Sequence, residues 1–190
     1  MAIAAPDRLH FTGDDEADAL IARDPFALLV GFALDQQVSV QKAFTAPLEL
    51  DRRLGTLEPG RIVATDPAEL EEIFRRKPAL HRYPGAMAGR VQDLAAHVEQ
   101  AYGGRAERIW SEARDGADLK ARLAALPGFG DMKVRSLLAV LAKRFGVRLD
   151  GLEEIVPTHP TLGDVDSAEA LDRYQAAKRA YKARMKSQAG

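Results

Sequence analysis

The residues with the clearest chemical potential are Leu126-Pro127-Gly128-Phe129-Gly130, followed by Asp131-Met132-Lys133. Two glycines on either side of an apolar residue let the backbone bend sharply and approach a ligand with no Cβ in the way. Phe129 can anchor such a bend in the space between two helices. The free N–H groups of Gly128, Gly130 and the next helical turn would then point outward. This arrangement predicts an anion site, and phosphate is its natural ligand.

Positive charge accompanies this bend. Four basic residues lie on or near the helix that follows it, opposed by one acid, Asp131: they are Lys133, Arg135, Lys143 and Arg144. The bend and the charge together favour a phosphate-binding hairpin. The alternative is a tight turn between two packed helices.

The elements around the bend are expected to be helices. One helix should end near Ala125 and the next should begin at about Asp131, with a buried stripe at helical spacing. Asp24-Pro25 and Asp66-Pro67 each combine an N-cap residue with a proline at the first helical position. Further helices are expected from near Gly85 to Gly103 and after Ser167. The pattern predicts about nine helices and no sheet, an all-α fold.

Composition excludes several classes of site. The chain has 190 residues, of which 46% are hydrophobic and 29% charged, as in an ordinary globular protein. It has no cysteine, which excludes disulfides, thiolate zinc sites, iron–sulfur clusters and a cysteine nucleophile. A net charge of -1 excludes a uniformly basic coat but allows a local basic patch. With no membrane-length apolar run and no secretion signal, we expect a soluble cytoplasmic protein.

With this hairpin, the sequence resembles the helix-hairpin-helix (HhH-GPD) DNA glycosylase superfamily, whose members often carry LPGxG there. Residues 34–39 (LDQQVS) are similar to the family's apolar-helix-then-QQ-S segment, and residues 80–84 (LHRYP) to the loop ahead of its long helix. The resemblance covers about residues 25–150, although ligases, polymerases and nucleases share the hairpin alone. It implies a two-lobed all-α fold with a DNA-binding cleft, in which a nucleotide is flipped out and its N-glycosidic bond is cut.

The same resemblance implies how the chain is divided. We expect one glycosylase fold over residues 1–190. Its central helical lobe should span 25–145, with the hairpin at 117–145. The second lobe should combine residues 1–24 with 146–190.

Family members carry an essential Asp about 20 residues beyond the last hairpin glycine, and here that residue is Asp150. A carboxylate there would stabilise an oxocarbenium-like sugar and orient or deprotonate the attacking water. The alternative is structural, because Asp150-Gly151 is a common turn and residues 150–153 (DGLE) could form a capping box. The weaker substitutes are Glu153, Glu154 and Asp164.

Bifunctional members of the family carry a Schiff-base lysine two residues after the second hairpin glycine, where this chain has Met132. Lys133 is one position later, a rotation of about 100° on a helix. We therefore expect Lys133 to face the DNA backbone, with Arg135 in support. A monofunctional enzyme follows, with water as the nucleophile and no lyase activity. Lys133 as a lyase amine is the alternative.

Three further residues are assigned DNA contacts by resemblance. The second Gln of the family's pair fills the gap left by the flipped nucleotide, which points to Gln37 with Gln36 beside it. Arg82 lies in the loop that carries an inserting wedge in related enzymes. The alternatives are a polar helix-to-helix turn for the glutamines and a solvated loop charge for Arg82.

No cofactor is required by these expectations, and no iron–sulfur cluster. The resemblance does imply a monovalent cation held by hairpin carbonyl groups, those of Ala124, Leu126 and Phe129. The chain is therefore expected to be a monomeric base excision repair glycosylase acting on double-stranded DNA with a damaged base, most similar to the alkylbase-removing class. One alternative is a non-catalytic DNA-binding protein on the same scaffold. Another is a helical interaction protein whose hairpin packs internally.

Overall fold

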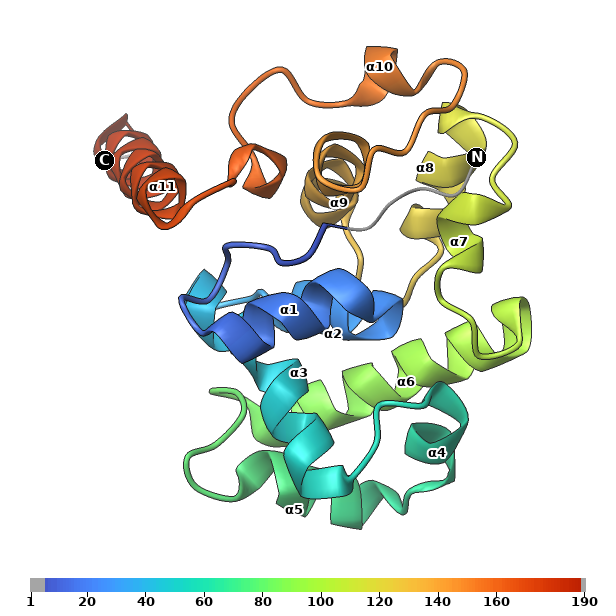
Figure 1. Cartoon of the computed structure of the whole chain (residues 1–190). Coiled ribbons are helices and arrows are strands. Elements are labelled where there is room, and N and C mark those ends of the chain that lie inside the picture. Colours follow the sequence, from blue (N-terminus) through green and yellow to red (C-terminus); the bar gives the residue numbers. More distant parts are fainter. Residues whose placement is uncertain (1–5, 189–190) are drawn as a thin grey trace.

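Residues 6–188 are described by the computed structural model, and every regular element among them is a helix (Figure 1). The first six helices are α1 (Asp15–Arg23), α2 (Pro25–Leu34), α3 (Val40–Leu54), α4 (Pro59–Ala64), α5 (Pro67–Arg75) and α6 (Pro84–Tyr102). The others are α7 (Arg108–Ser111), α8 (Gly116–Ala124), α9 (Asp131–Lys143), α10 (Leu152–Ile155), the 3-10 turn η1 (Leu162–Asp164) and α11 (Ala168–Gln188). The all-α expectation is confirmed. The short helices α4, α7 and α10 hold too few residues for their periodicity to appear in the sequence.

Local capping explains where several helices begin. Asp24 Oδ1 accepts hydrogen bonds from the N–H groups of Phe26 (2.8 Å) and Ala27 (3.1 Å). Asp66 caps α5 in the same way, and Ser167 Oγ accepts from the first turn of α11. Each cap satisfies N–H groups that have no partner inside the helix. The caps predicted at these three residues are confirmed.

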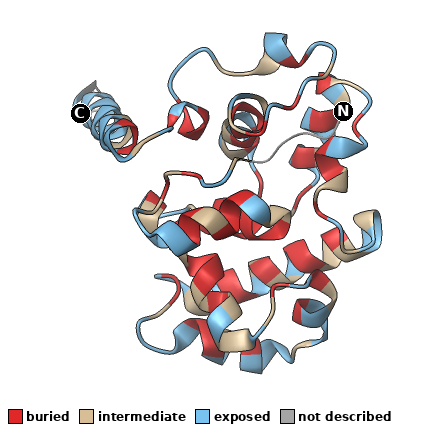
Figure 2. Ribbon diagram, in the orientation of Figure 1, coloured by how far each residue is buried: buried red, intermediate tan, exposed pale blue. Residues whose placement is uncertain are grey.

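Helix α2 lies at the centre of the fold. All its residues from Phe26 to Leu34 are buried, and it packs against α1, α3 and α6 (Figure 2). A helix that is apolar on every side can be stable only inside a protein. The other N-terminal helices therefore pack around α2, and the chain emerges from the core where α2 ends.

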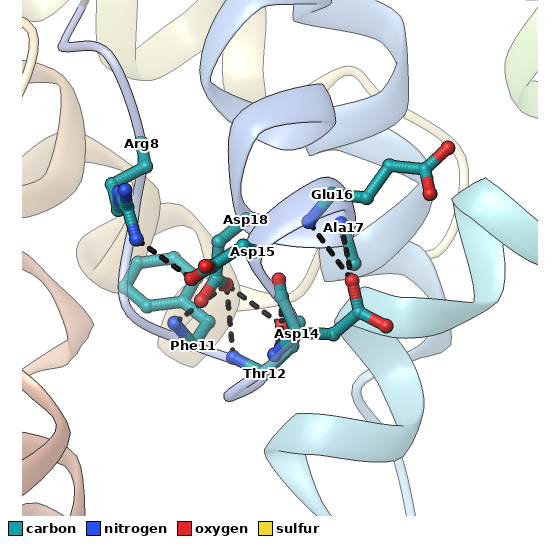
Figure 3. Close-up of polar contacts among 8 residues, drawn as sticks. All are labelled: Arg8, Phe11, Thr12, Asp14, Asp15, Glu16, Ala17 and Asp18. Carbon is teal, nitrogen blue, oxygen red and sulfur yellow. Dashed lines mark hydrogen bonds and ion pairs between the residues drawn. The ribbon is translucent and has the colours of Figure 1, made fainter.

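The N-terminal segment is held on α1 by a buried carboxylate (Figure 3). Asp18 is 3% exposed, and its Oδ1 accepts hydrogen bonds from the N–H groups of Phe11 and Thr12, both at 3.0 Å, and from Thr12 Oγ1 at 2.9 Å. These bonds compensate the cost of burying the charge. They also bring Phe11 against Phe44 on α3, with ring centroids 5.0 Å apart.

Some helix contacts cross the boundary between the two expected lobes, and the division itself stays a prediction. Helix α1 packs on α2 and α3, within the part that was expected to be the central lobe. The hairpin helices α8 and α9 pack with α10 and η1, which come from the expected second lobe. Residues 1–5, 189 and 190 of the expected ranges lie outside the described residues. None of the helices among residues 6–188 is both long and apolar enough to traverse a lipid bilayer.

Close packing of α2 on α3 gives a stability prediction. A Cβ added at Gly31 would lie 2.3 Å from Phe44 Cδ1, deep in the core, so Gly31→Ala should lower the free energy of unfolding by about 1–3 kcal/mol. Gly89 is exposed on α6 with open space around it, and Gly89→Ala should raise that free energy by about 0.5–1 kcal/mol. Urea denaturation of both variants measures the difference. Equal effects of the two substitutions would contradict this packing.

Candidate nucleic-acid interface

The hairpin between α8 and α9 has the predicted geometry. Gly128 has a φ of 79°, in the left-handed region that favours glycine. Phe129 is 6% exposed and anchors the bend in the core, whereas Gly128 and Gly130 are exposed on either side of it. The predicted apolar anchor is confirmed.

The backbone N–H groups of this hairpin are mostly unpaired. Among the described residues, Phe129 N–H donates to the Leu126 carbonyl (3.1 Å), but the N–H groups of Gly128 and Gly130 have no acceptor. The first three N–H groups of α9, from Asp131 on, also have none, and Gly130 supplies no capping side chain. Unpaired, exposed N–H groups at a helix N-terminus form an anion site.

Arg90 of α6 joins the hairpin to the loop after α2. A Cβ added at Gly128 would lie 2.8 Å from Arg90 Cδ and 2.9 Å from Arg90 Nε, so this side chain lies directly over the bend. Its Nη1 donates a hydrogen bond to Gln36 Oε1 at 2.6 Å. The structure therefore brings together the hairpin and the glutamine pair, two of the features assigned to DNA binding.

The loop between α2 and α3, residues 35–39, carries Gln36 and Gln37, and we call it the glutamine loop. Its backbone is strained at one residue. Gln37 has a φ of 58° and is the one non-glycine residue in the left-handed region among residues 6–188. Both glutamine side chains are exposed, and Tyr83 Oη donates a hydrogen bond to Gln37 Oε1 (3.1 Å). A residue held in this region costs free energy, and such strain is concentrated at functional sites. Arg82 is exposed beside Tyr83, with its guanidinium carbon 5.4 Å from the ring centroid.

A buried histidine holds this loop in place. His81 is 1% exposed, and its Nε2 lies 3.2 Å from the carbonyl oxygen of Leu34 and 3.0 Å from that of Gln36. Its Nδ1 accepts a hydrogen bond from Tyr83 N–H (3.0 Å), so the proton of the neutral ring must be on Nε2. Burial lowers the pKa of His81, which favours this neutral form.

Lys133 points toward the end of α2, and its expected contact with the DNA backbone stays a prediction. Lys133 is half-buried, and its Nζ donates a hydrogen bond to the Ala33 carbonyl at 3.0 Å, while Met132 is 77% exposed. The reason is that the last carbonyl groups of a buried helix need donors, and a cation is favourable at that end. Burial lowers the pKa of Lys133 to about 8, and the charge of Arg90 acts in the same direction.

Asp35 is the carboxylate nearest in sequence to the glutamine pair. It is half-buried, and its side chain accepts no hydrogen bond from a described residue. Burial raises the pKa of Asp35, and the positive charges of three lysines oppose that shift: Lys133, Lys178 and Lys182. Burial, together with the charge of Asp35, raises the pKa of Tyr174 on α11 to about 12. The charges that act on Asp35 therefore come from side chains of α9 and α11.

Arg135 is on the exposed side of α9. Its Nε lies 2.9 Å from Asp131 Oδ2, four residues earlier on the helix, and both side chains are largely exposed. The charge of Asp131 at the helix N-terminus is therefore balanced by Arg135. Because Arg135 balances Asp131, that carboxylate does not repel an anion that binds to the hairpin N–H groups.

The structure does not bring Asp150 to the hairpin. Its carbonyl oxygen accepts a hydrogen bond from Gly116 N–H (2.8 Å), at the start of α8, whereas the hairpin follows the end of that helix, about 12 Å away. Asp150 is exposed on an open pocket of about 720 Å³, which Ala142 and Lys143 at the C-terminal end of α9 help to line, but no residue of the bend 126–130 does. The expected capping box is wrong, because Gly151 is the N-cap of α10 and no side chain caps that helix.

The substitutes for Asp150 are also distant from the hairpin bend. Glu153 and Glu154 line the same pocket as Asp150. Asp164 closes a capping box with Thr161 and pairs with Lys143 Nζ at 2.6 Å, at the C-terminal end of α9. Its carboxylate therefore has a structural role.

The hairpin carbonyl groups suit an oxygen-preferring cation. Among the described residues, the carbonyl oxygens of Ala124 and Phe129 accept no hydrogen bond, and that of Leu126 accepts one. A carbonyl oxygen has two lone pairs, so all three groups retain a free acceptor position. Side chains do not offer an alternative: over residues 6–188, no group of three or more His, Asp or Glu residues is arranged to hold a metal.

Comparison with known proteins found no similar family model, no similar curated protein and no similar solved structure.

Four residues that belong to this surface were missed in the sequence: Asp35, Tyr83, Arg90 and Tyr174. Two of them lie inside segments that were already singled out, Asp35 in residues 34–39 and Tyr83 in residues 80–84. Their place in these segments was the available signal. Arg90 and Tyr174 lie on amphipathic helices, where an arginine or tyrosine has no distinguishing pattern.

The His81 contacts predict how stability depends on pH. Its pKa lies below the ordinary value of 6.5 in the folded chain, so the unfolded chain binds a proton more readily. The contribution to the free energy of unfolding is therefore complete above pH 6.5 and decreases as pH falls toward the folded-state pKa. Urea denaturation across this range should show a smaller decrease for His81→Gln than for wild type. The exposed His159→Gln is the control, and a wild-type slope in His81→Gln would contradict this role.

Proposed function

We propose that this chain is a base excision repair DNA glycosylase that binds double-stranded DNA through its α8–α9 hairpin. The observation that carries the proposal is the exposed set of unpaired N–H groups at Gly128, Gly130 and the first turn of α9. Backbone phosphate is the anion that such groups bind at a helix N-terminus. A two-lobed glycosylase fold with a DNA-binding cleft, a monomer and a cytoplasmic location are parts of the same proposal.

The strained loop beside the hairpin supports the part of the proposal in which the protein distorts the DNA duplex. Gln37 is exposed, and its amide offers both donors and acceptors to a base that has lost its partner. Tyr83 and His81 hold the loop that carries it, and Arg90 connects it to the hairpin. A preformed loop of this kind loses little conformational freedom when DNA binds. We therefore assign Gln37, with Gln36 and the exposed Arg82, to the gap left by a flipped nucleotide.

The reaction is the hydrolysis of the bond between C1′ of the sugar and the base nitrogen. As this bond breaks, its electron pair leaves with the base, and water forms the new bond to C1′. A carboxylate stabilises the positive charge that develops on the sugar and accepts the proton of water. Asp35 suits this role better than Asp150, because Asp35 directly precedes Gln36, which Arg90 joins to the bend, whereas Asp150 lies beside the start of α8.

One observation favours the second candidate, a DNA-binding protein without catalytic activity. Asp150, the residue at the family's catalytic spacing, lies about a helix length from the hairpin. A chain that retained the hairpin and lost the chemistry would bind duplex DNA and release no base. Base release from a panel of damaged duplexes decides between the two candidates.

Binding through the hairpin requires Gly128. Gly128→Ala would strain the left-handed backbone and force Arg90 to move. Charge-assisted hydrogen bonds contribute about 1.5–3 kcal/mol each, so affinity for duplex DNA should fall about tenfold or more. Fluorescence anisotropy with a labelled duplex measures this loss. Gly55→Ala is the matched control, because its φ of 82° imposes the same strain with nothing within 4 Å. Equal affinities of the two variants would exclude the hairpin from binding.

Base release distinguishes the two carboxylates. Asp35→Asn should reduce the rate of base release from the reactive lesion by about 100-fold or more and leave duplex binding intact. Asp150→Asn should retain both binding and activity. Loss of activity in Asp150→Asn alone would return the catalytic role to that residue. A covalent adduct trapped by borohydride and dependent on Lys133 would replace water with this amine as the nucleophile.

A further inference from the structure

The C-terminal helix α11 projects from the rest of the molecule (Figure 1). Its first turns are anchored, because Ala170 and Leu171 are buried and Gln175 exchanges two hydrogen bonds with Gln41 of α3, at 2.6 and 3.2 Å. From residue 176 to residue 187 every side chain is exposed (Figure 2). We call residues 176–187 the arm. It covers about 18 Å, measured from the helical rise.

The arm is strongly basic. From residue 173 to the end of α11 there are six basic residues and no acidic one: Arg173, Lys178, Arg179, Lys182, Arg184 and Lys186. None of these six forms an ion pair with a described carboxylate within 4.0 Å. Three of the lysines follow one another at i, i+4 spacing, where like charges repel and destabilise a helix. An arm without core contacts therefore gains stability from a ligand that carries repeated negative charge.

Beside Tyr174, Gln175 holds α11 against the first turn of α3, directly after the loop that carries Gln36 and Gln37. Tyr174 itself is half-buried against the body of the protein, and Lys178 and Lys182 are close enough to act on the charge of Asp35. Tyr181 and Met185 lie within about 20° of Tyr174 around the helix and are 59% and 50% exposed. The side of α11 that contacts the rest of the protein at Tyr174 therefore continues along the arm, where Tyr181 and Met185 are exposed to solvent. Because Asp35 directly precedes Gln36, this side of α11 borders the surface that carries the hairpin.

We propose that the arm binds the phosphate backbone of duplex DNA, alongside the strand held by the hairpin. This inference rests on the proposed function and adds a second binding surface to it. Duplex DNA carries one negative charge per about 1.7 Å of its axis, so a basic helix of this length can meet several phosphates. A single duplex that spans both surfaces satisfies the hairpin N–H groups and the arm together.

The dependence of affinity on salt tests the arm. The variant K178Q/R179Q/K182Q/R184Q removes four positive charges and keeps residues that favour helices. Each phosphate contact that is lost should reduce the slope of log K against log salt by about 0.9. The expected reduction is therefore about 2–4. Anisotropy titrations of wild type and variant, with helicity checked by circular dichroism, give the two slopes.

A matched control removes the same charge elsewhere. R61Q/R105Q/R114Q/K120Q changes four exposed basic residues on α4, on α8 and on the loops either side of α7, away from α11 in Figure 1. This control should keep the wild-type slope. A smaller variant, K182Q/R184Q, removes only the two of the four arm charges that lie farthest from the anchored turns and should give about half of the full reduction. Its helix is anchored as in wild type, so a folding defect cannot produce that result.

Equal slopes in the arm variant and the wild type would overturn the arm proposal. If the wild type also releases a damaged base, the proposed function stands without the arm. A wild-type chain that shows no salt-dependent duplex binding would overturn both proposals. Reduced slopes in both arm variants, with the control unchanged, support the arm.

Discussion

The carbonyl groups at the C-terminal end of α2 must find hydrogen-bond donors inside the protein. Helix α2 is buried along its length, so water cannot satisfy its last carbonyl groups as it does at an exposed helix end. Two side chains from distant segments supply the donors, Lys133 to Ala33 and His81 to Leu34. An unsatisfied buried carbonyl costs about 1–3 kcal/mol, so Lys133 is held firmly against Ala33, while the Leu34 carbonyl also accepts a hydrogen bond from Gln36 N–H (2.7 Å). The candidate interface is assembled around this helix end.

Each of these donors also positions a part of the interface. His81 bonds to Gln36 and to Tyr83, and it thereby fixes the loop in which Gln37 adopts its left-handed conformation. Lys133 belongs to the first turn of α9, so its contact with α2 sets where the hairpin lies relative to that loop. Arg90 completes the connection between the loop and the bend. The hydrogen bonds that satisfy the buried end of α2 therefore also fix the positions of the exposed loop and of the hairpin.

Charge is distributed unevenly on this molecule. The whole chain carries a net charge of -1, yet the arm of α11 has basic residues and no acidic one. At the hairpin, the exposed N–H groups are also positive, and the one acid beside them, Asp131, is balanced by Arg135. Asp35 lies where these two positive regions approach each other, and nearby lysines favour its ionised form against the cost of burial. A carboxylate in such surroundings is suited to stabilising positive charge on a substrate. Asp150 lies on an open pocket near the start of α8, and no residue of the bend 126–130 lines that pocket.

The sequence by itself determined the helices, their caps at Asp24, Asp66 and Ser167, and the hairpin with its buried Phe129, because these depend on residues within about one helical turn or on a regular period. Only the tertiary structure decided which side chains meet. The direction of Lys133 depended on the needs of a buried helix end 100 residues earlier in the chain. Whether Asp35 or Asp150 lies nearer to the bend depended on how α8, α9 and the loop after α2 pack, and spacing along the chain cannot supply that information.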